Sequence, residues 1–478
     1  MSKNSLIACA VLFFFLCLSA QSLSAPISSA ADSDHHMTSI WCAWGEKLGI
    51  CENRIESDTG VTVDVPFFVQ MCEGRPITEW RRCEEVNTHP QMQNLRSTSS
   101  EANNLFYVTM RVFASESVTR SILIIRIVNS LMATLVAFLI LKIARGRLLT
   151  AAVSGITFVF VPLAFSQLTV ATPKSWAVLG AMFSWVFLYS ALYQRTNPLN
   201  TRFAWFAYGL CMLLVFSTRI DATFFAIFSS IIVLLKPKFN LGWLELRRFF
   251  SWSIPVFVLT LLAIKQLGRF GSYIAFPAPR TDLPLVNYLF AETVQIFETS
   301  ISVFGFGTGQ SGGSPGIIGI ISFGLFAMFL GTSLLHPTRL QKRAVLATAL
   351  FLAFTIYRGN NSIGLQLPGT YVLAIPLMLV GFAVLFADTK PAFVFSGGGR
   401  NTVISLLALA NGYALFGHME YYVRKGVDNG AFLRLSLNGG WWWNTPVSPN
   451  LVFLAGAAAF PAFLWFAWRV VDVEEQAL

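Results

Sequence analysis

Charged residues are scarce in this sequence of 478 residues: Asp, Glu, Lys and Arg together make up 12% of it. Soluble globular domains carry about 25%. Hydrophobic residues make up 55%, and Phe alone accounts for 44 positions. The shortage of charge excludes an ordinary soluble protein. The sequence therefore predicts an all-α integral membrane protein.

Signals for nucleotide and nucleic-acid chemistry are also missing. The sequence contains no Walker loop, no GxGxxG after a strand and no HExxH, and we find no internal repeat or low-complexity tract. The net charge of +10 favours a nucleic-acid partner at first sight. However, the basic residues lie between hydrophobic runs, as in cytoplasmic loops of membrane proteins. We therefore expect a lipid bilayer, and no nucleic acid, as a partner.

The first segment, residues 1–25, has Lys3, an apolar run and then small residues. This pattern is typical of either a cleavable signal peptide or a signal-anchor helix, and we favour a retained helix. Both alternatives place residue 30 on the extracytoplasmic side. A long polar segment, 26–117, follows and predicts an extracytoplasmic cap with one or two short helices.

Residues 118–470 predict a polytopic bundle, followed by a cytoplasmic tail at 471–478. Its hydrophobic runs are long enough to cross about 30 Å of hydrocarbon. One further run, 285–306, carries Glu292, Gln295 and Glu298, so we interpret it as an amphipathic helix at the outer interface. With the first segment, the predicted spans number about twelve; those in the bundle are 119–142, 149–167, 175–194, 203–218, 221–236, 249–266, 315–335, 344–357, 370–388, 401–417 and 449–470.

Basic residues follow every even-numbered span of this series. Such loops are cytoplasmic in multi-pass proteins of the plasma membrane, which again puts the segment 26–117 outside. The basic residues are Lys142, Arg145 and Arg147; Arg195 and Arg202; Lys236, Lys238, Arg247 and Arg248; Arg339, Lys342 and Arg343; and Lys390 and Arg400.

Four of the seven cysteines, Cys42, Cys51, Cys72 and Cys83, lie in the polar segment. Cysteines beside a membrane on the oxidising side favour disulfides. Three pairings are open, and the short loops favour Cys42–Cys51 with Cys72–Cys83. A zinc site is the alternative, although the spacings are wider than CxxC.

The densest group of titratable residues follows the first hydrophobic segment, in ADSDHHMTSIWCAWG (31–45). A carboxylate of Asp32 or Asp34 just outside the membrane can act as a general base on a sugar hydroxyl. The neighbouring His35 and His36 can orient that carboxylate or hold a divalent metal. The alternative is a polar linker that merely leaves the membrane.

Three cations lie at the outer ends of predicted spans. Lys174 opens one span, where it can bind a lipid phosphate; the alternative is a snorkelling lysine. Arg219 and Asp221 separate two apolar runs, so they either grip a phosphate or form a structural ion pair. Arg358 ends a later run and is a third candidate for phosphate.

Several segments resemble one known family along nearly the whole chain. They are SDHHMTSIWCAWGE, NNLFYVTMRVF (103–113), VPLAFSQLTVATPKSWAV (161–178), LVFSTRIDATFF (214–225), LPGTYVLAIPLML (367–379) and WWWNTPVSP (441–449). Their order and spacing are similar to those of the actinobacterial multi-pass membrane family of domain-of-unknown-function 2142. That family is similar in outline to the membrane-embedded C-type glycosyltransferases (GT-C), which use polyprenyl-phosphate sugars and an acidic residue in the first outer loop.

The resemblance implies a GT-C-like helical bundle with Asp32 or Asp34 as the counterpart of that acid and His36 beside it. This chain departs from the family at two points. Ser33 separates two acids that are often adjacent in the family, and Gly369-Thr370-Tyr371 replaces a frequent Gly-Arg-Tyr. Tyr371 is then a supporting residue, and the missing arginine weakens phosphate binding at this corner.

We therefore expect a cell-envelope glycosyltransferase that takes a polyprenyl-phosphate-linked sugar on the outer face and transfers it to an envelope glycan or protein. The catalytic candidates are Asp32, Asp34 and His36. Lys174, Arg219 and Arg358 would hold the donor phosphate, with Asp221, His35 and Tyr371 in support. The sequence does not decide whether a divalent cation takes part. The alternatives are a transporter or flippase of an envelope precursor and a non-catalytic membrane scaffold.

Overall fold

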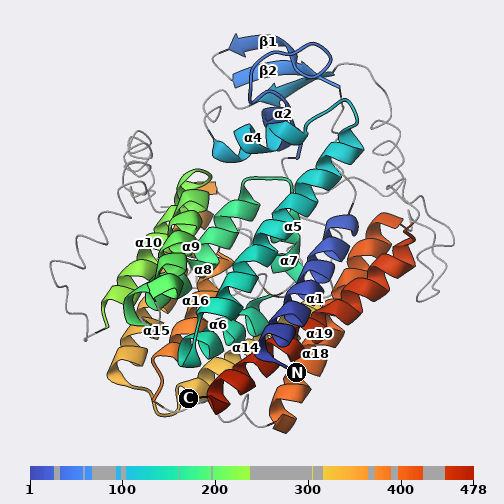
Figure 1. The fold of residues 1–478 in the computed structure, drawn as a ribbon. Helices are drawn as coiled ribbons and strands as arrows, with labels where there is room; N and C mark the ends of the chain where they lie inside the picture. The colour runs from blue at the N-terminus through green and yellow to red at the C-terminus, as the bar shows by residue number, and fades with distance from the viewer. Residues whose placement is uncertain are drawn as a thin grey trace, which may run out of the picture.

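Apolar runs of the chain form long helices that lie side by side, and a small cap covers one end of them in this computed structural model (Figure 1). Both termini lie at the other end. The structure describes residues 1–25, 33–57, 60–66, 93–97, 104–160, 162–194, 198–236, 304, 316–363, 372–388, 397–423 and 447–477.

Seven of the described helices are long and apolar enough to cross a membrane, and four shorter apolar helices accompany them. The protein is therefore mostly helical, as its composition predicts. The long helices are α1 (Lys3–Leu23), α5 (Val118–Ile143), α8 (Lys174–Tyr193), α9 (Pro198–Phe216), α15 (Arg339–Ile363), α18 (Gly397–Val423) and α19 (Pro449–Gln476). The shorter ones are α6 (Gly146–Val159), α10 (Ile220–Leu234), α14 (Gly316–Ser333) and α16 (Ala374–Leu385).

The described helices differ from the predicted spans in two places. The run 149–167 is not one helix, because α6 ends before Phe160, whose ψ of 62° is not helical, and α7 (Pro162–Thr169) begins at a proline. A proline suits the first position of a helix and not its interior. The last described helix also continues to Gln476, through most of the predicted tail at 471–478. The predicted span 249–266 and the predicted interfacial helix 285–306 lie outside the described residues.

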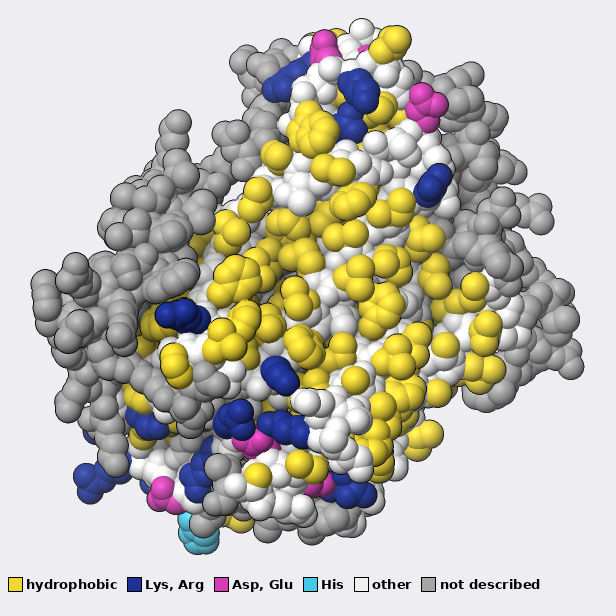
Figure 2. Space-filling model, viewed as in Figure 1, with side chains coloured by type: hydrophobic (Ala, Val, Ile, Leu, Met, Phe, Trp, Pro, Cys, Tyr) yellow, Lys and Arg dark blue, Asp and Glu magenta, His cyan; other side chains and the backbone are white. Residues whose placement is uncertain are grey.

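A hydrophobic surface covers the face of the bundle on which α5 lies. Leu131, Leu135 and Phe138 of α5 share one helix face and are 51%, 48% and 37% exposed. Figure 2 shows hydrophobic side chains spread across the helical part of the molecule, with charged side chains gathered beyond them toward both ends. A polar solvent disfavours so large an apolar area, so this face suits contact with lipid.

The cap consists of α2 (Ser33–Trp41), a three-stranded antiparallel sheet, α4 (Leu105–Met110) and the short 3-10 helix η3 (Arg111–Phe113). The sheet, which the sequence did not predict, has the strand order β1 (Glu52–Ser57), β2 (Gly60–Val65) and β3 (Gln93–Ser97). Val63 and Val65 alternate along β2 and are buried, so one face of the strand belongs to the core. A disulfide joins Cys42, just after α2, to Cys51, just before β1.

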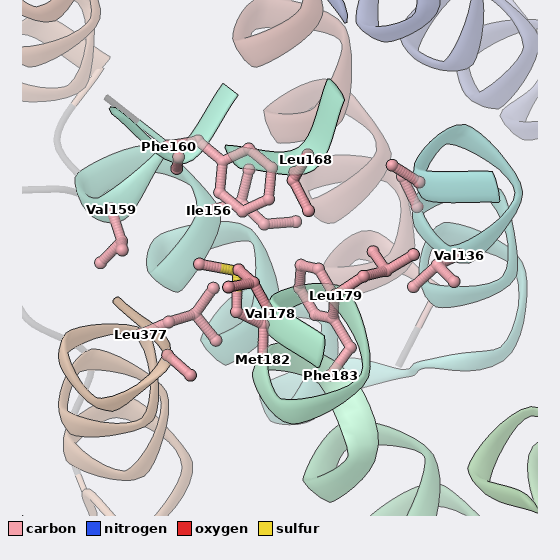
Figure 3. Packing of buried hydrophobic residues seen from close by; sticks show 14 of the residues in the cluster. Val136, Ile156, Val159, Phe160, Leu168, Val178, Leu179, Met182, Phe183 and Leu377 are labelled. Atoms are coloured by element: carbon pink, nitrogen blue, oxygen red, sulfur yellow. The ribbon is translucent and has the colours of Figure 1, made fainter. Parts of the chain in front are cut away.

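Helix α8 lies at the centre of the bundle, and its residues from Lys174 to Leu192 are all buried. Side chains of α6, α8 and α16 converge on one cluster that includes Ile156, Met182 and Leu377 (Figure 3). Trp185 of α8 packs against Gly381 of α16, where a Cβ atom would lie 2.4 Å from the indole ring. Glycine thus allows two helices to approach closely, as is common in membranes.

The first helix is held at both ends by charged side chains of distant segments. At its beginning, Lys3 forms an ion pair with the buried Glu474 of α19, which also accepts a hydrogen bond of 3.1 Å from Arg145 Nη1. At its end, the buried Arg126 of α5 donates from Nη1 to the carbonyl oxygens of Ser22 and Ala25, at 3.0 and 2.7 Å. Ser22 belongs to the last turn of α1, where carbonyl groups have no acceptor role within the helix itself, so the guanidinium caps this helix end.

Candidate functional site

A small, partly open hollow lies between α8, α10 and α16. Three charged residues that the sequence analysis had selected line it together: Lys174, Arg219 and Asp221. Its remaining walls are apolar, because the other lining residues are Ala177, Val178, Ala181, Ala222, Phe225, Leu373 and Ala374. The hollow therefore combines charged groups with a hydrocarbon-like surface.

Local structure explains why these charges meet. Lys174 is the first residue of α8, directly after Pro173, and its side chain is buried although it carries a charge. Arg219 is extended and stands at the N-cap of α10, with Asp221 in the first helical turn. The beginnings of two helices thus meet at the hollow, and the exposed N–H groups and partial positive charge of such helix ends favour anions.

Arg219 and Asp221 form a close ion pair. Arg219 donates from Nε to Asp221 Oδ1 at 2.9 Å and from Nη2 to Oδ2 at 2.8 Å, so one edge of the guanidinium faces both oxygens of the carboxylate. Asp221 Oδ1 also accepts from the backbone N–H of Ala222 at 2.9 Å. This parallel arrangement is the strongest geometry for an arginine and a carboxylate.

The cap contributes His36 to the same neighbourhood. His36 Nδ1 lies 2.7 Å from the hydroxyl oxygen of Tyr107, which is buried in α4. Burial, followed by the positive charges of His35, Lys174 and Arg219, lowers the pKa of His36 to about 3. At neutral pH the imidazole is therefore uncharged and can serve as a hydrogen-bonding group beside the two cations.

Contacts between the cap and the bundle fix this arrangement. The ring of Phe106 stands edge-on to Trp176 in the first turn of α8, with ring centroids 5.2 Å apart. Trp176 Nε1 in turn donates to Asn129 Oδ1 of α5 at 3.1 Å. Asn104 Nδ2 donates to the carbonyl oxygen of Thr218, just before Arg219, at 3.4 Å. The cap therefore packs over the beginnings of α8 and α10, where Lys174 and Arg219 lie.

The other predicted site residues are placed as follows. Asp32, Tyr371, Cys72 and Cys83 lie outside the described residues, and Asp34 is described only in its backbone, as part of α2. His35 is half-buried, with its ring centroid 5.5 Å from that of His36. Arg358, half-buried near the end of α15, does not line the hollow. The structure therefore brings together Lys174, Arg219, Asp221 and His36.

Tyr107 and Asn104 are the residues that sequence reasoning missed. Both belong to the quoted segment NNLFYVTMRVF, but nothing in its pattern indicates which side chain faces the bundle. Within the described ranges, no three His, Cys, Asp or Glu side chains gather closely enough to hold a metal ion.

The low pKa of His36 predicts a dependence of stability on pH. Unfolded His36 takes up a proton near pH 6.5, whereas folded His36 does so near pH 3, so the unfolded state binds more protons between these values. Stability should therefore fall as the pH is lowered from 6.5 toward 3, by up to about 1.4 kcal/mol per pH unit from this residue. In His36→Gln this contribution disappears. Thermal unfolding of both proteins at pH 7.5 and pH 5 checks this, and equal losses of melting temperature would contradict it.

Comparisons with known proteins add one match. The model of a family described as a predicted membrane protein (DUF2142) matches residues 13–268, more than half of the chain. The matched range contains the cap, α8 and the ion pair of Arg219 with Asp221. No curated protein matches the chain, and neither does any solved structure.

Proposed function

The chain belongs to this DUF2142 family of predicted membrane proteins, and from that premise we propose that it is a cell-envelope glycosyltransferase. It takes a sugar linked to a polyprenyl phosphate and transfers the sugar to an envelope glycan or protein. The chemistry takes place on the side of the plasma membrane that carries the cap. One observation carries the proposal: two cations from separate helices, one of them paired with Asp221, line a single hollow whose remaining walls are apolar.

A polyprenyl-phosphate sugar fits the composition of the hollow. Lys174 and Arg219 supply positive charge for the phosphate, and the starts of α8 and α10 add the partial positive charge of a helix N-terminus. Phe225 and the small apolar residues around it suit the first units of a hydrocarbon chain. A soluble anion would gain nothing from these apolar walls, so the hollow favours an amphiphile.

The orientation follows from the charges at the two ends of the bundle. Lys3, Lys142 and Arg145 lie at the end remote from the cap, where both termini are found (Figure 1). Basic residues are enriched on the cytoplasmic side of membrane proteins. The cap, with its disulfide between Cys42 and Cys51, would then face the oxidising extracytoplasmic side.

In the proposed reaction, Asp32 or Asp34 accepts the proton of an acceptor hydroxyl. The resulting oxygen forms a bond to the anomeric carbon of the sugar from the side opposite the phosphate. The bond between that carbon and the phosphate oxygen breaks, and the phosphate leaves with the electron pair. Lys174 and Arg219 stabilise the negative charge that grows on the leaving phosphate. The sugar is transferred with inversion of its anomeric configuration.

Replacing Lys174 tests the proposal. A hydrogen bond to a charged group contributes about 1.5–3 kcal/mol, so Lys174→Gln should lower transfer roughly 10- to 150-fold. The readout is the amount of product glycan in the cell envelope, measured by mass spectrometry at equal protein levels. Lys236→Gln is the matched control, because Lys236 follows α10 at the opposite end and lies against Tyr189 and Tyr193.

An unchanged glycan profile in folded Lys174→Gln, with the control also unchanged, would remove the basis of the proposal.

The transporter alternative predicts a different result. Purified protein in liposomes would then move a polyprenyl-phosphate sugar between the leaflets without forming a product.

A further inference from the structure

The cap carries a buried arginine that has no acidic partner among the described residues. Arg111, the first residue of η3, is only 4% exposed. The ion pairs of the described residues do not include it, and burial lowers the pKa of its guanidinium. Removing a guanidinium from water without a counter-charge is costly. An anion from outside the chain would offset this cost.

One edge of this guanidinium is unused. Arg111 Nη1 donates to the carbonyl oxygen of Ala114 at 3.3 Å. Nε is buried and has no hydrogen-bond partner within the described ranges. Nη2 donates to none of the described residues either and, unlike Nε, is not completely covered. Arginine offers Nε–H and Nη2–H as a parallel pair that matches two oxygens of a phosphate, so this edge can receive one.

Trp44 lies over the same guanidinium. The centre of its ring is 5.6 Å from Arg111 Cζ, and its Nε1 donates to the carbonyl oxygen of Val108 at 3.1 Å. These two contacts hold the indole in place. Trp44 is nevertheless 60% exposed, and Val112, next to Arg111, is 63% exposed. A cation flanked by two exposed apolar side chains suits a ligand with a charged head and an apolar body.

This group of residues lies where a membrane-crossing helix begins. Ser115 follows η3 closely, and its N–H donates to Ser121 Oγ, in the first turn of α5, at 3.0 Å. The hydroxyl oxygens of the two serines are 2.8 Å apart. The 26 residues of α5 span about 39 Å, more than the roughly 30 Å of hydrocarbon. The helix therefore reaches the headgroup layer on the cap side, where tryptophan is enriched in membrane proteins.

We propose that Arg111 and Trp44 form a binding site for an anionic phospholipid in the leaflet on the cap side of the membrane. The phosphate pairs with the Nε and Nη2 edge of Arg111, and the glycerol and the first methylene groups lie against Trp44 and Val112. The bound lipid anchors the cap to the membrane. None of these residues lines the hollow with Lys174, so the inference does not depend on the transfer reaction proposed above.

Photolabelling of the full-length protein tests this. Nanodiscs of phosphatidylcholine, which has no net charge, contain a small fraction of phosphatidylglycerol with a diazirine near the top of one acyl chain. After illumination, mass spectrometry measures the label in residues 42–48 and 108–114 relative to that in the lipid-facing part of α5. The phosphatidylglycerol probe should label these two segments about tenfold more than a phosphatidylcholine probe with the same diazirine.

Variants of the cap show which group is responsible. Arg111→Gln should lower this labelling about tenfold, because the charge-assisted hydrogen bonds to the phosphate are lost. Arg111→Lys keeps the charge and should keep a preference for phosphatidylglycerol. Lys47→Gln is the matched control, because Lys47 is an exposed cation in the loop that also carries Trp44, and its labelling should equal that of the wild type. The wild-type preference can be measured even if Arg111→Gln fails to fold.

Four outcomes would overturn the proposal. Equal labelling of the wild-type protein by the two probes would leave only ordinary contact of the cap with the membrane. An unchanged preference in folded Arg111→Gln would make the arginine a structural partner of Trp44. Displacement of the probe by excess inorganic phosphate would show that the site takes a free phosphate. If neither probe labels these segments, they lie away from lipid, and a protein partner is favoured.

Discussion

Replacing Asp32 and Asp34 together with Asn should lower sugar transfer by about 10²- to 10⁴-fold. That range is the usual contribution of a general base, and Asn keeps the shape of Asp while it loses the ability to accept a proton. The two acids flank Ser33, where α2 begins, and α2 also carries His36 close to the cations of the hollow. Product glycans measured by mass spectrometry, together with transfer by the purified protein, provide the readout.

Glu116→Gln is the matched control for this pair, because Glu116 is an exposed acid of the same polar segment, 26–117. It should transfer sugar as the wild type does. The two single variants, Asp32→Asn and Asp34→Asn, identify the base, since only one of them should reproduce the full loss. A folded double variant with normal glycans would exclude both acids as the base and would favour the scaffold alternative.

The second large effect is on stability: Gly381→Ala should destabilise the protein by about 1–3 kcal/mol. The new Cβ would lie 2.4 and 2.6 Å from two carbon atoms of the Trp185 ring. Trp185 is fully buried, so its rigid ring can move only if neighbouring helices also move. The gain in helix propensity from Gly to Ala is about 1 kcal/mol at most and does not offset such an overlap.

Thermal unfolding of the purified protein in lipid or detergent measures this effect. Gly331→Ala in α14 is the control, because a Cβ there meets no atom within 4 Å, and its melting temperature should equal or exceed that of the wild type. A smaller ring should relieve the overlap, so Trp185→Phe is expected to restore part of the stability lost in Gly381→Ala. If Gly381→Ala has the same melting temperature as Gly331→Ala, α8 and α16 are not packed closely at Gly381 and Trp185.

The helical bundle was predictable because crossing a membrane imposes a simple requirement on sequence. About 20 apolar residues in succession are needed, and the runs that form α5, α8 and α19 meet it. The break at Phe160 was harder to predict, since the apolar run continues across it and only Pro162 signals the second helix. The sheet of the cap was missed because its strands are short and polar on one side.

Part of the candidate site was also accessible from sequence. Lys174, Arg219 and Asp221 stood out because charges are costly beside hydrocarbon unless they have a partner or line a cavity. Their meeting in one hollow, however, depends on how α8 and α10 pack, which no local pattern encodes. The same holds for Tyr107, whose contact with His36 joins residues 71 positions apart, and for Arg358, which does not line the hollow.

The contact between the first and the last helix has a consequence for how the protein is made. Glu474 lies 471 positions after Lys3, yet α1 and α19 pack along each other and share this ion pair. During synthesis α1 is translated before the other described helices, and α19 is translated after them. The face of α1 that packs against α19 therefore has no such partner until α19 has been translated, and a nascent chain that lacks α19 leaves this face uncovered.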